Sequence, residues 1–248
     1  DLDRLMRERD LAALIVLASH SYSAPLDYLT GGVAISGGFV VKAPDAAPFI
    51  VANPMETEEA AASGLEVLTP RDLGYHDLLK TLDGDVRAAQ VQMWGKALER
   101  ANVTEGRVGL YGEAGVHEAL SLAQRLNAIL TQYQFVGEDA PSLFEYAAIT
   151  KDRDELARLF KVAERTNEVV AATRDFIASH RASPDELVVN ADGVPLTIGA
   201  VKRFVRHQLL DRDLEEQHMI FAQGRDAGYP HSRGEESQVL RMGQSIVF

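Results

Sequence analysis

Short apolar runs alternate with amphipathic stretches along the first part of the chain. Runs rich in Val, Ile, Leu and Phe predict β-strands at residues 12–18, 38–41, 48–51 and 107–111. Apolar positions at helical spacing predict helices at residues 56–63, 77–101 and 116–130, the second broken at Asp83-Gly84-Asp85. This alternation of strands and helices indicates an α/β domain.

The pattern then changes to that of one long amphipathic helix, predicted over residues 151–180. Its apolar stripe consists of Leu156, Phe160, Ala163, Val170 and Ile177. Because the change falls just before this helix, we expect two domains, at residues 1–147 and 148–248.

Shorter elements are predicted beyond the long helix. Ser183 followed by Pro184 is typical of a helix start, because Ser caps a helix and Pro suits its first turn. We expect a further helix at residues 198–210, a strand at 218–222, a turn-rich segment at 224–234 and a final strand at 245–248.

Composition narrows the possible functions. The 248 residues are 46% hydrophobic, which is enough for a packed core. Lys and Arg total 25 against 37 Asp and Glu, and the net charge of -12 argues against nucleic acid or an anionic membrane surface as a partner. Without cysteine, a metal site would use carboxylates and His. The apolar run at residues 11–18 is too short to span a bilayer, and we expect a cytoplasmic protein.

Glycines near residue 35 have part of the spacing of a phosphate-binding loop. Gly32 and Gly37 match its first and second glycines, but Gly38 and Phe39 stand where Lys and Ser or Thr would contact phosphate and magnesium. We therefore interpret these glycines as turn residues that supply positive φ around a hairpin.

Two further motifs are incomplete. Ser36 lies in a sequence close to the Gly-x-Ser-x-Gly nucleophile motif, but a strand rather than a helix is predicted after Gly38, which favours a polar hairpin residue. His117-Glu118 begins a zinc-peptidase pattern, yet Ser121 occupies the position of its second His. That pair is better explained as a helix N-terminus with an acidic first turn.

His231 lies in a different context, on a segment stiffened by proline. Pro230 fixes its own φ and favours an extended Tyr229, and Gly228 and Gly234 border the segment. Such a segment suits an imidazole that forms hydrogen bonds or transfers protons. From residue type alone, a loop His is more often structural or merely exposed than catalytic.

Four segments carry a resemblance when they are read in order along the chain. They are LDYLTG at residues 26–31, TKDRDEL at 150–156, FAQGRDAGYPH at 221–231 and LRMGQSIVF at 240–248. In order, they resemble the Tyr-Leu-Thr-Gly, Lys-Ser-x-x-Glu-Ile, Ala-Ser-Gly-x-Asn-x-x-x-Pro-His and Leu-x-x-Gly-Asp-x-Val motifs of the creatinase and Xaa-Pro peptidase family. This family of pita-bread metallopeptidases includes aminopeptidase P and prolidase. The chain departs from these motifs at Ala148, Asp226 and Gln244, where the family usually has Arg, Asn and Asp.

The resemblance implies an α/β N-terminal creatinase-like domain followed by an incomplete α+β pita-bread catalytic domain. In the family, the strand matched by residues 245–248 runs into an Asp-x-Gly that supplies the first metal ligand. None of the five usual ligands is in this sequence. We therefore expect a fragment, a partial chain or a truncated protein.

The implied activity is metal-dependent hydrolysis of peptide bonds next to proline, of the Xaa-Pro dipeptidase or aminopeptidase P type. Two divalent ions, Mn, Co or Zn, would activate a bridging water and polarise the scissile carbonyl. His231 matches the family histidine that binds substrate and steadies the oxyanion, which makes it the candidate catalytic residue. Tyr22 and Tyr28 are candidates for the substrate entrance, although core packing explains Tyr28 equally well. The resemblance also implies a homodimer.

Two alternatives stay open. In a metal-free creatinase-like enzyme, which cleaves a C–N bond of a small guanidino compound, His231 would be the general acid and base. An inactive pita-bread protein would instead bind peptides without hydrolysing them.

Overall fold

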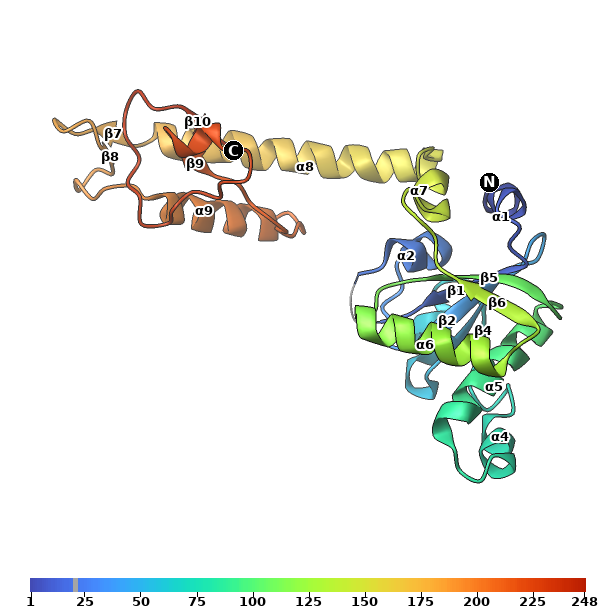
Figure 1. Cartoon of the computed structure of the whole chain (residues 1–248). Helices are drawn as coiled ribbons and strands as arrows, with labels where there is room; N and C mark the ends of the chain where they lie inside the picture. The colour runs from blue at the N-terminus through green and yellow to red at the C-terminus, as the bar shows by residue number, and fades with distance from the viewer. Residues whose placement is uncertain (20–21) are drawn as a thin grey trace. The chain divides into compact units, whose positions relative to one another are not determined.

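The computed structural model describes residues 1–19 and 22–248 of the chain (Figure 1). These residues form two compact units, Asp1–Thr150 and Lys151–Phe248. The domain limits predicted from the sequence, 1–147 and 148–248, stay a prediction.

A six-stranded mixed sheet forms the centre of the first unit. Its strands are β1 (Ala13–Leu17), β2 (Gly38–Lys42), β3 (Phe49–Ala52), β4 (Glu66–Leu68), β5 (Gly106–Tyr111) and β6 (Tyr133–Val136). They follow the order β4-β3-β2-β1-β5-β6, in which β2 is antiparallel to both of its neighbours and the other neighbouring pairs are parallel. The predicted α/β class and the four predicted strands are confirmed. β4 and β6 are short and partly polar, so their sequences carried no strand pattern.

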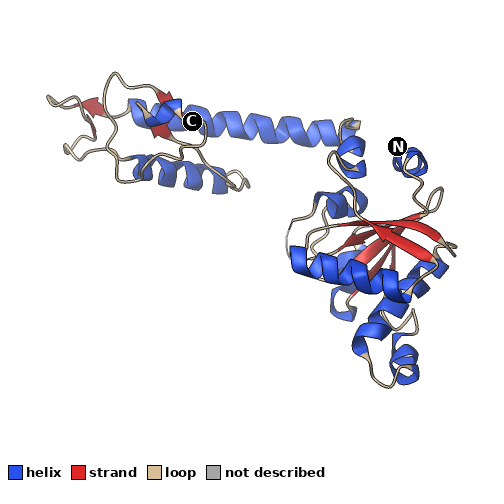
Figure 2. Ribbon diagram, viewed as in Figure 1, coloured by secondary structure: helices blue, strands red, loops and turns tan. Residues whose placement is uncertain are grey.

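Helices cover both faces of this sheet (Figure 2). They are α1 (Leu2–Glu8), α2 (Ala24–Thr30), α3 (Thr57–Ala61), α4 (Tyr75–Thr81), α5 (Val86–Arg100), α6 (Val116–Ile129), α7 (Leu143–Ala147) and the 3-10 turn η1 (Pro54–Glu56). α5 and α6 pack with Ala13 and Ile15 of β1, whereas α1, α2, α3 and α7 pack with Leu14 and Val16. Successive side chains of β1 point to opposite faces of the sheet and are thus divided between two apolar layers.

The predicted break between α4 and α5 is confirmed. Asp83 and Gly84 have φ of 51° and 83°, which ends the first helix. The Asp85 side chain then accepts hydrogen bonds from the backbone N–H of Arg87 and Ala88, both at 3.0 Å, and caps α5.

The glycine-rich segment before β2 differs from the predicted hairpin. Gly31 caps the end of α2 with φ of 74°, so the segment joins a helix to a strand. Positive φ occurs at Gly32 (90°) and Gly38 (107°), but not at Gly37. The inserted α2 is the reason, because β1 and β2 pair across a longer connection than a hairpin turn.

Two helices and two small strand pairs build the second unit. They are α8 (Arg153–Ala178), α9 (Ile198–Leu210), β7 (Arg181–Ala182) paired with β8 (Val188–Val189), and β9 (Ala222–Gln223) paired with β10 (Ile246–Val247), with the 3-10 turn η2 (Asp226–Gly228) after β9. Asp152 caps α8, and both long helices confirm the sequence prediction. The core is formed by Val169, Val188, Leu196, Ile198, Val201, Val205, Phe221 and Leu240.

Three local predictions for this unit are wrong. Ser183 and Pro184 lie in the turn between β7 and β8, where Ser183 and Leu187 exchange backbone and side-chain hydrogen bonds and Glu186 has φ of 61°. Pairing of the two strands therefore overrides the local helix signal. Residues 218–221 do not form a strand, and strand pairing starts only at Ala222.

The third error concerns the apolar stripe of α8. Val169 and Thr173 are the buried residues of this helix, whereas the predicted stripe residue Phe160 is 72% exposed. The core of the unit packs on the second half of the helix, so the predicted stripe residue Ile177 contacts the core, whereas the stripe residues of the first half do not.

None of the helices in residues 1–19 and 22–248 is both long enough and apolar enough to cross a bilayer.

Gly38→Ala is expected to destabilise the first unit by at least about 2 kcal/mol. A Cβ at Gly38 would lie 2.0 Å from the Val51 carbonyl oxygen of the paired strand, and φ is 107°. Urea unfolding followed by fluorescence of Trp94, the chain's single Trp, measures this change. Gly37→Ala is the matched control, since nothing lies within 4 Å of its Cβ position and its stability should change by less than about 0.5 kcal/mol. Equal stability of the two variants would contradict this account.

Candidate functional site

His231 lies on a loop of the second unit that follows β9 and η2. Tyr229 has φ of -104° and ψ of 114°, so the predicted extended conformation before Pro230 is confirmed. Tyr229 also places its ring beside Arg225, whose guanidinium carbon is 5.7 Å from the ring centroid and which donates to the Tyr229 hydroxyl at 3.2 Å. The backbone just before His231 is therefore restrained.

Backbone contacts hold this loop at both ends. The Gly224 N–H donates to the Ser245 carbonyl at 2.9 Å, and the buried Lys202 ammonium donates to the Gly234 carbonyl at 3.3 Å. Gly234 has φ of 72°, and a Cβ there would lie 2.0 Å from the Phe221 carbonyl oxygen. The loop is therefore attached to the segment before β10 at Gly224 and to α9 at Gly234, on either side of His231.

Gln223, in β9, reinforces the start of the loop. It is 1% exposed, and its side-chain amide donates to the Val239 carbonyl at 2.6 Å while accepting from the Arg241 N–H at 2.9 Å. Both ends of a buried amide are thereby satisfied. In the sequence, Gln223 is only one residue of the FAQGRDAGYPH motif, and its role in joining two segments is visible only in the folded chain.

The His231 imidazole is exposed and forms no hydrogen bond within the described part of the chain. A neutral imidazole carries one donor and one acceptor nitrogen, so it is available to bind a polar group of a ligand. A second histidine, His218, lies within hydrogen-bonding distance of Arg233, with 3.2 Å between Nδ1 and the guanidinium. His231 is thus an accessible side chain on a firmly attached loop.

Tyr22, the second candidate residue, belongs to the first unit and lines a pocket of about 540 Å³. Its side chain is 73% exposed, as expected for a residue at the rim of an opening. The other lining residues are Ser19, Ser23, Leu26, Asp27, Gly32, Val33, Ala34, Ile35, Ser36 and Glu56. Tyr28 does not line this pocket; it packs edge to face on Phe144, with 5.8 Å between ring centroids, but it is 39% exposed and is therefore not a core residue.

Polar groups in this pocket were not identified from the sequence. Asp27 is half-buried, and burial raises the pKa of its carboxyl group. Ser23 is 1% exposed, and its hydroxyl has no hydrogen-bond partner among the described residues. The Ser23-Ala24-Pro25 sequence, a helix start ahead of the LDYLTG motif, was the available signal for both.

Ser36 lines the same pocket and has a structural role there. Its hydroxyl and its N–H both bind Oε1 of Glu56, the latter at 2.9 Å. β2 follows at Gly38, so the helix that a nucleophile motif requires after the serine is replaced by a strand. His117 and Glu118 lie in the first turn of α6, which confirms the helix N-terminus predicted for them.

Because the chain has no cysteine, a metal site would be formed by His, Asp and Glu side chains. Within residues 1–19 and 22–248, no three His, Asp or Glu side chains are grouped so that they could hold a metal ion. The side chains described here therefore do not fit a dinuclear centre by themselves.

Comparison with known proteins identifies the fold. The sequence matches no protein-family model and no curated protein. Similar solved structures include an Xaa-Pro dipeptidase from Bacillus anthracis, with 14% identity and a TM-score of 0.67, and an X-Pro aminopeptidase from Thermotoga maritima MSB8, with 17% identity and a TM-score of 0.62. Each of these matches covers 99% of this chain and 58% of the other chain.

A third similar structure is the N-terminal domain of FACT complex subunit SPT16 from Cicer arietinum (chickpea). It has 13% identity and a TM-score of 0.55, and the match covers 96% of this chain and 58% of the other. The chain thus spans 58% of the length of these three structures. Identities this low establish the fold alone, and over nearly its whole length this chain has the fold of the corresponding part of Xaa-Pro dipeptidases and X-Pro aminopeptidases.

Proposed function

We propose that this chain is part of a metal-dependent exopeptidase that hydrolyses peptide bonds next to proline. One observation carries the proposal: 99% of the chain has the fold of an Xaa-Pro dipeptidase and of an X-Pro aminopeptidase. The Pro-His pair of the family motif also lies on an accessible, firmly attached loop. Proline-containing peptides are the proposed substrates.

His231 is the proposed catalytic residue of this chain. An exposed imidazole without a hydrogen-bond partner among the described residues is free to donate to a substrate carbonyl. A donor placed at the oxygen that gains negative charge stabilises the transition state more than the ground state. In this proposal, His231 binds the substrate and steadies the oxyanion.

Tyr22 is proposed to bind substrate at the entrance. It is exposed beside a pocket of about 540 Å³ that contains the half-buried Asp27 and the Ser23 hydroxyl, which has no hydrogen-bond partner among the described residues. An aromatic ring at such a rim offers apolar contact area with few rotatable bonds. This arrangement supports a role in restricting the length of peptide that enters.

Two divalent ions, Mn, Co or Zn, are proposed for the working enzyme. Because no suitable ligand group occurs in residues 1–19 and 22–248, this part of the proposal requires ligands from further polypeptide. We also propose a homodimer in the cytoplasm. Exposed apolar side chains on α8, such as Phe160, support association, and the absence of cysteine suits a reducing compartment.

Metal content and hydrolysis test the proposed function together. In a protein that includes the polypeptide supplying the ligands, we expect about two divalent ions per chain and turnover of Xaa-Pro dipeptides or tripeptides that a chelator abolishes and added metal restores. Elemental analysis, intact mass and product release by chromatography are measured on the same sample. Turnover of a small guanidino compound without bound metal would instead support the creatinase-like alternative.

In the intact enzyme that includes the metal ligands, His231→Ala is expected to lower kcat about a hundredfold or more while leaving the fold intact, because an oxyanion donor contributes on the order of 3 kcal/mol to the barrier. Steady-state kinetics on an Xaa-Pro substrate measures this loss. His207→Ala is the control, because His207 is an exposed histidine of α9 in the same unit. Unchanged kcat in the His231 variant would remove the catalytic role.

Tyr22→Ala is expected to reduce the discrimination between short and long Xaa-Pro peptides by about tenfold, since it removes an aromatic side chain from the pocket rim. Ratios of kcat/KM for a dipeptide and a pentapeptide provide the measurement. Tyr22→Phe keeps the ring and should retain the discrimination of the unmodified protein. Selectivity that stays constant in both variants would reject the entrance role.

A second candidate function is peptide or protein binding without hydrolysis. The similarity to the N-terminal domain of a FACT complex subunit supports it, because that protein is described as part of a complex. A purified protein that binds Xaa-Pro peptides but releases no product after metal addition would favour this candidate.

A further inference from the structure

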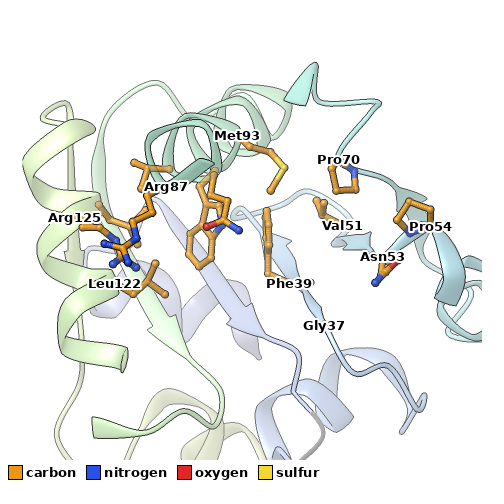
Figure 3. A pocket seen from close by; sticks show the side chains of 16 residues that line it. Gly37, Phe39, Val51, Asn53, Pro54, Pro70, Arg87, Met93, Leu122 and Arg125 are labelled. Atoms are coloured by element: carbon orange, nitrogen blue, oxygen red, sulfur yellow. The ribbon is translucent and has the colours of Figure 1, made fainter. Parts of the chain in front are cut away.

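A second pocket lies in the first unit, between the sheet and the helices α5 and α6 (Figure 3). Its volume is about 450 Å³, within the range of small-molecule sites. Gly37 to Phe39 at the start of β2 and Val51 to Pro54 at the end of β3 line one side. Because β2 is antiparallel, these segments lie at the edge where the parallel strands end, which is where ligands bind to open α/β sheets.

The inner wall of this pocket is apolar. Trp94 is 7% exposed and lies against Phe39, with 4.7 Å between the ring centroids. Met93, Val91 and Leu126, which are also buried, complete the wall. These side chains provide a surface for the apolar body of a ligand.

Two arginines line the same pocket. Arg87 lies in the first turn of α5, and Arg125 lies on α6 next to Leu122. Figure 3 shows both side chains at one side of the pocket, with Asn53, Pro54 and Pro70 at the other. The pocket therefore combines an apolar wall with a positively charged side.

Neither guanidinium has an ion-pair partner among the described residues. Within residues 1–19 and 22–248, no carboxylate oxygen lies within 4.0 Å of Arg87 or Arg125, and the side-chain contact of Arg125 is to the neutral Ser121 hydroxyl at 3.1 Å. A cation in the first turn of α5 is also disfavoured by the helix dipole. In a chain with net charge -12, two cations that have no ion-pair partner among the described residues and line one apolar pocket favour the binding of an anion.

We propose that this pocket binds a small organic acid. Its carboxylate accepts hydrogen bonds from Arg87 and Arg125, and its apolar body lies against Trp94 and Phe39. Guanidinium groups match the two oxygens of a carboxylate, which gives the site its preference for an acid over a neutral amide. The site is independent of His231 and of the proposed hydrolysis.

Trp94 reports on this site directly, because it is the only tryptophan of the chain. The full chain is titrated with phenylbutyrate and, separately, with the neutral phenylbutyramide, and binding is followed by Trp94 fluorescence and by calorimetry. We expect saturable binding of the acid, at least about tenfold weaker binding of the amide, and weaker binding of the acid as salt is added.

Substitutions of the two arginines show whether the fluorescence and calorimetric signals arise from binding in this pocket. Arg87→Gln and Arg125→Gln are each expected to weaken acid binding about tenfold, and Gln90→Glu, which adds a carboxylate to the lining, should abolish it. Lys96→Gln is the matched control, since Lys96 is an exposed cation of α5 that pairs with Glu99 and does not line the pocket. Its affinity should equal that of the unmodified chain.

Three results would overturn the proposal. They are equal affinity for the acid and the amide, an affinity for the acid in both arginine variants that equals that of the unmodified chain, and no saturable heat or fluorescence change with the acid. Thermal unfolding of each variant in the absence of ligand shows that it is folded before its affinity is interpreted.

Discussion

Both units of this protein depend on a backbone approach that only glycine permits. In the first unit, Gly38 begins β2 against the Val51 carbonyl, and in the second unit, Gly234 ends the His231 loop against the Phe221 carbonyl. In each case, φ is positive and a Cβ would lie 2.0 Å from the carbonyl oxygen. A side chain at either position would push apart the two segments that shape a pocket or hold a loop.

The contact at Gly38 has consequences for the whole edge of the sheet. β2 pairs with both β1 and β3, so its start fixes the register in the middle of the six strands. That register places Phe39 against Trp94 and brings the ends of β3 and α5 around one pocket. The pocket beside Tyr22 is lined by Ile35 and Ser36 of the segment just before β2.

A partly buried carboxylate connects the outer elements of the first unit to this sheet. Glu138 binds Arg9 through its side chain, and it accepts hydrogen bonds from the Tyr111 hydroxyl at 2.7 Å and the Leu143 N–H at 2.8 Å. Burial opposes ionisation of Glu138, but these three donors together hold its pKa below the usual value. Burial of the Tyr111 hydroxyl, together with its hydrogen bond to the negatively charged Glu138, raises the pKa of Tyr111. The start of α7 is thereby attached to the end of β5.

The sequence by itself determined the elements whose signals are local and strong. Four strands of the sheet, the long helices α8 and α9 and the extended Tyr229 before Pro230 follow from apolar periodicity and from proline geometry. The order of four motifs along the chain also indicated the fold that the solved structures share.

Only the tertiary structure decided the features that depend on contacts between distant segments. Ser183-Pro184 forms a turn because β7 and β8 pair. The helix α8 buries Val169 rather than Phe160 because α9 and the loops pack on one half of the helix. Arg87 and Arg125 have no motif in common, and they line one pocket only because α5 and α6 pack on the same face of the sheet. The free energy of a local secondary-structure preference is smaller than the free energy gained by burying and pairing such segments. The packing of the chain therefore determines which surfaces are available for binding.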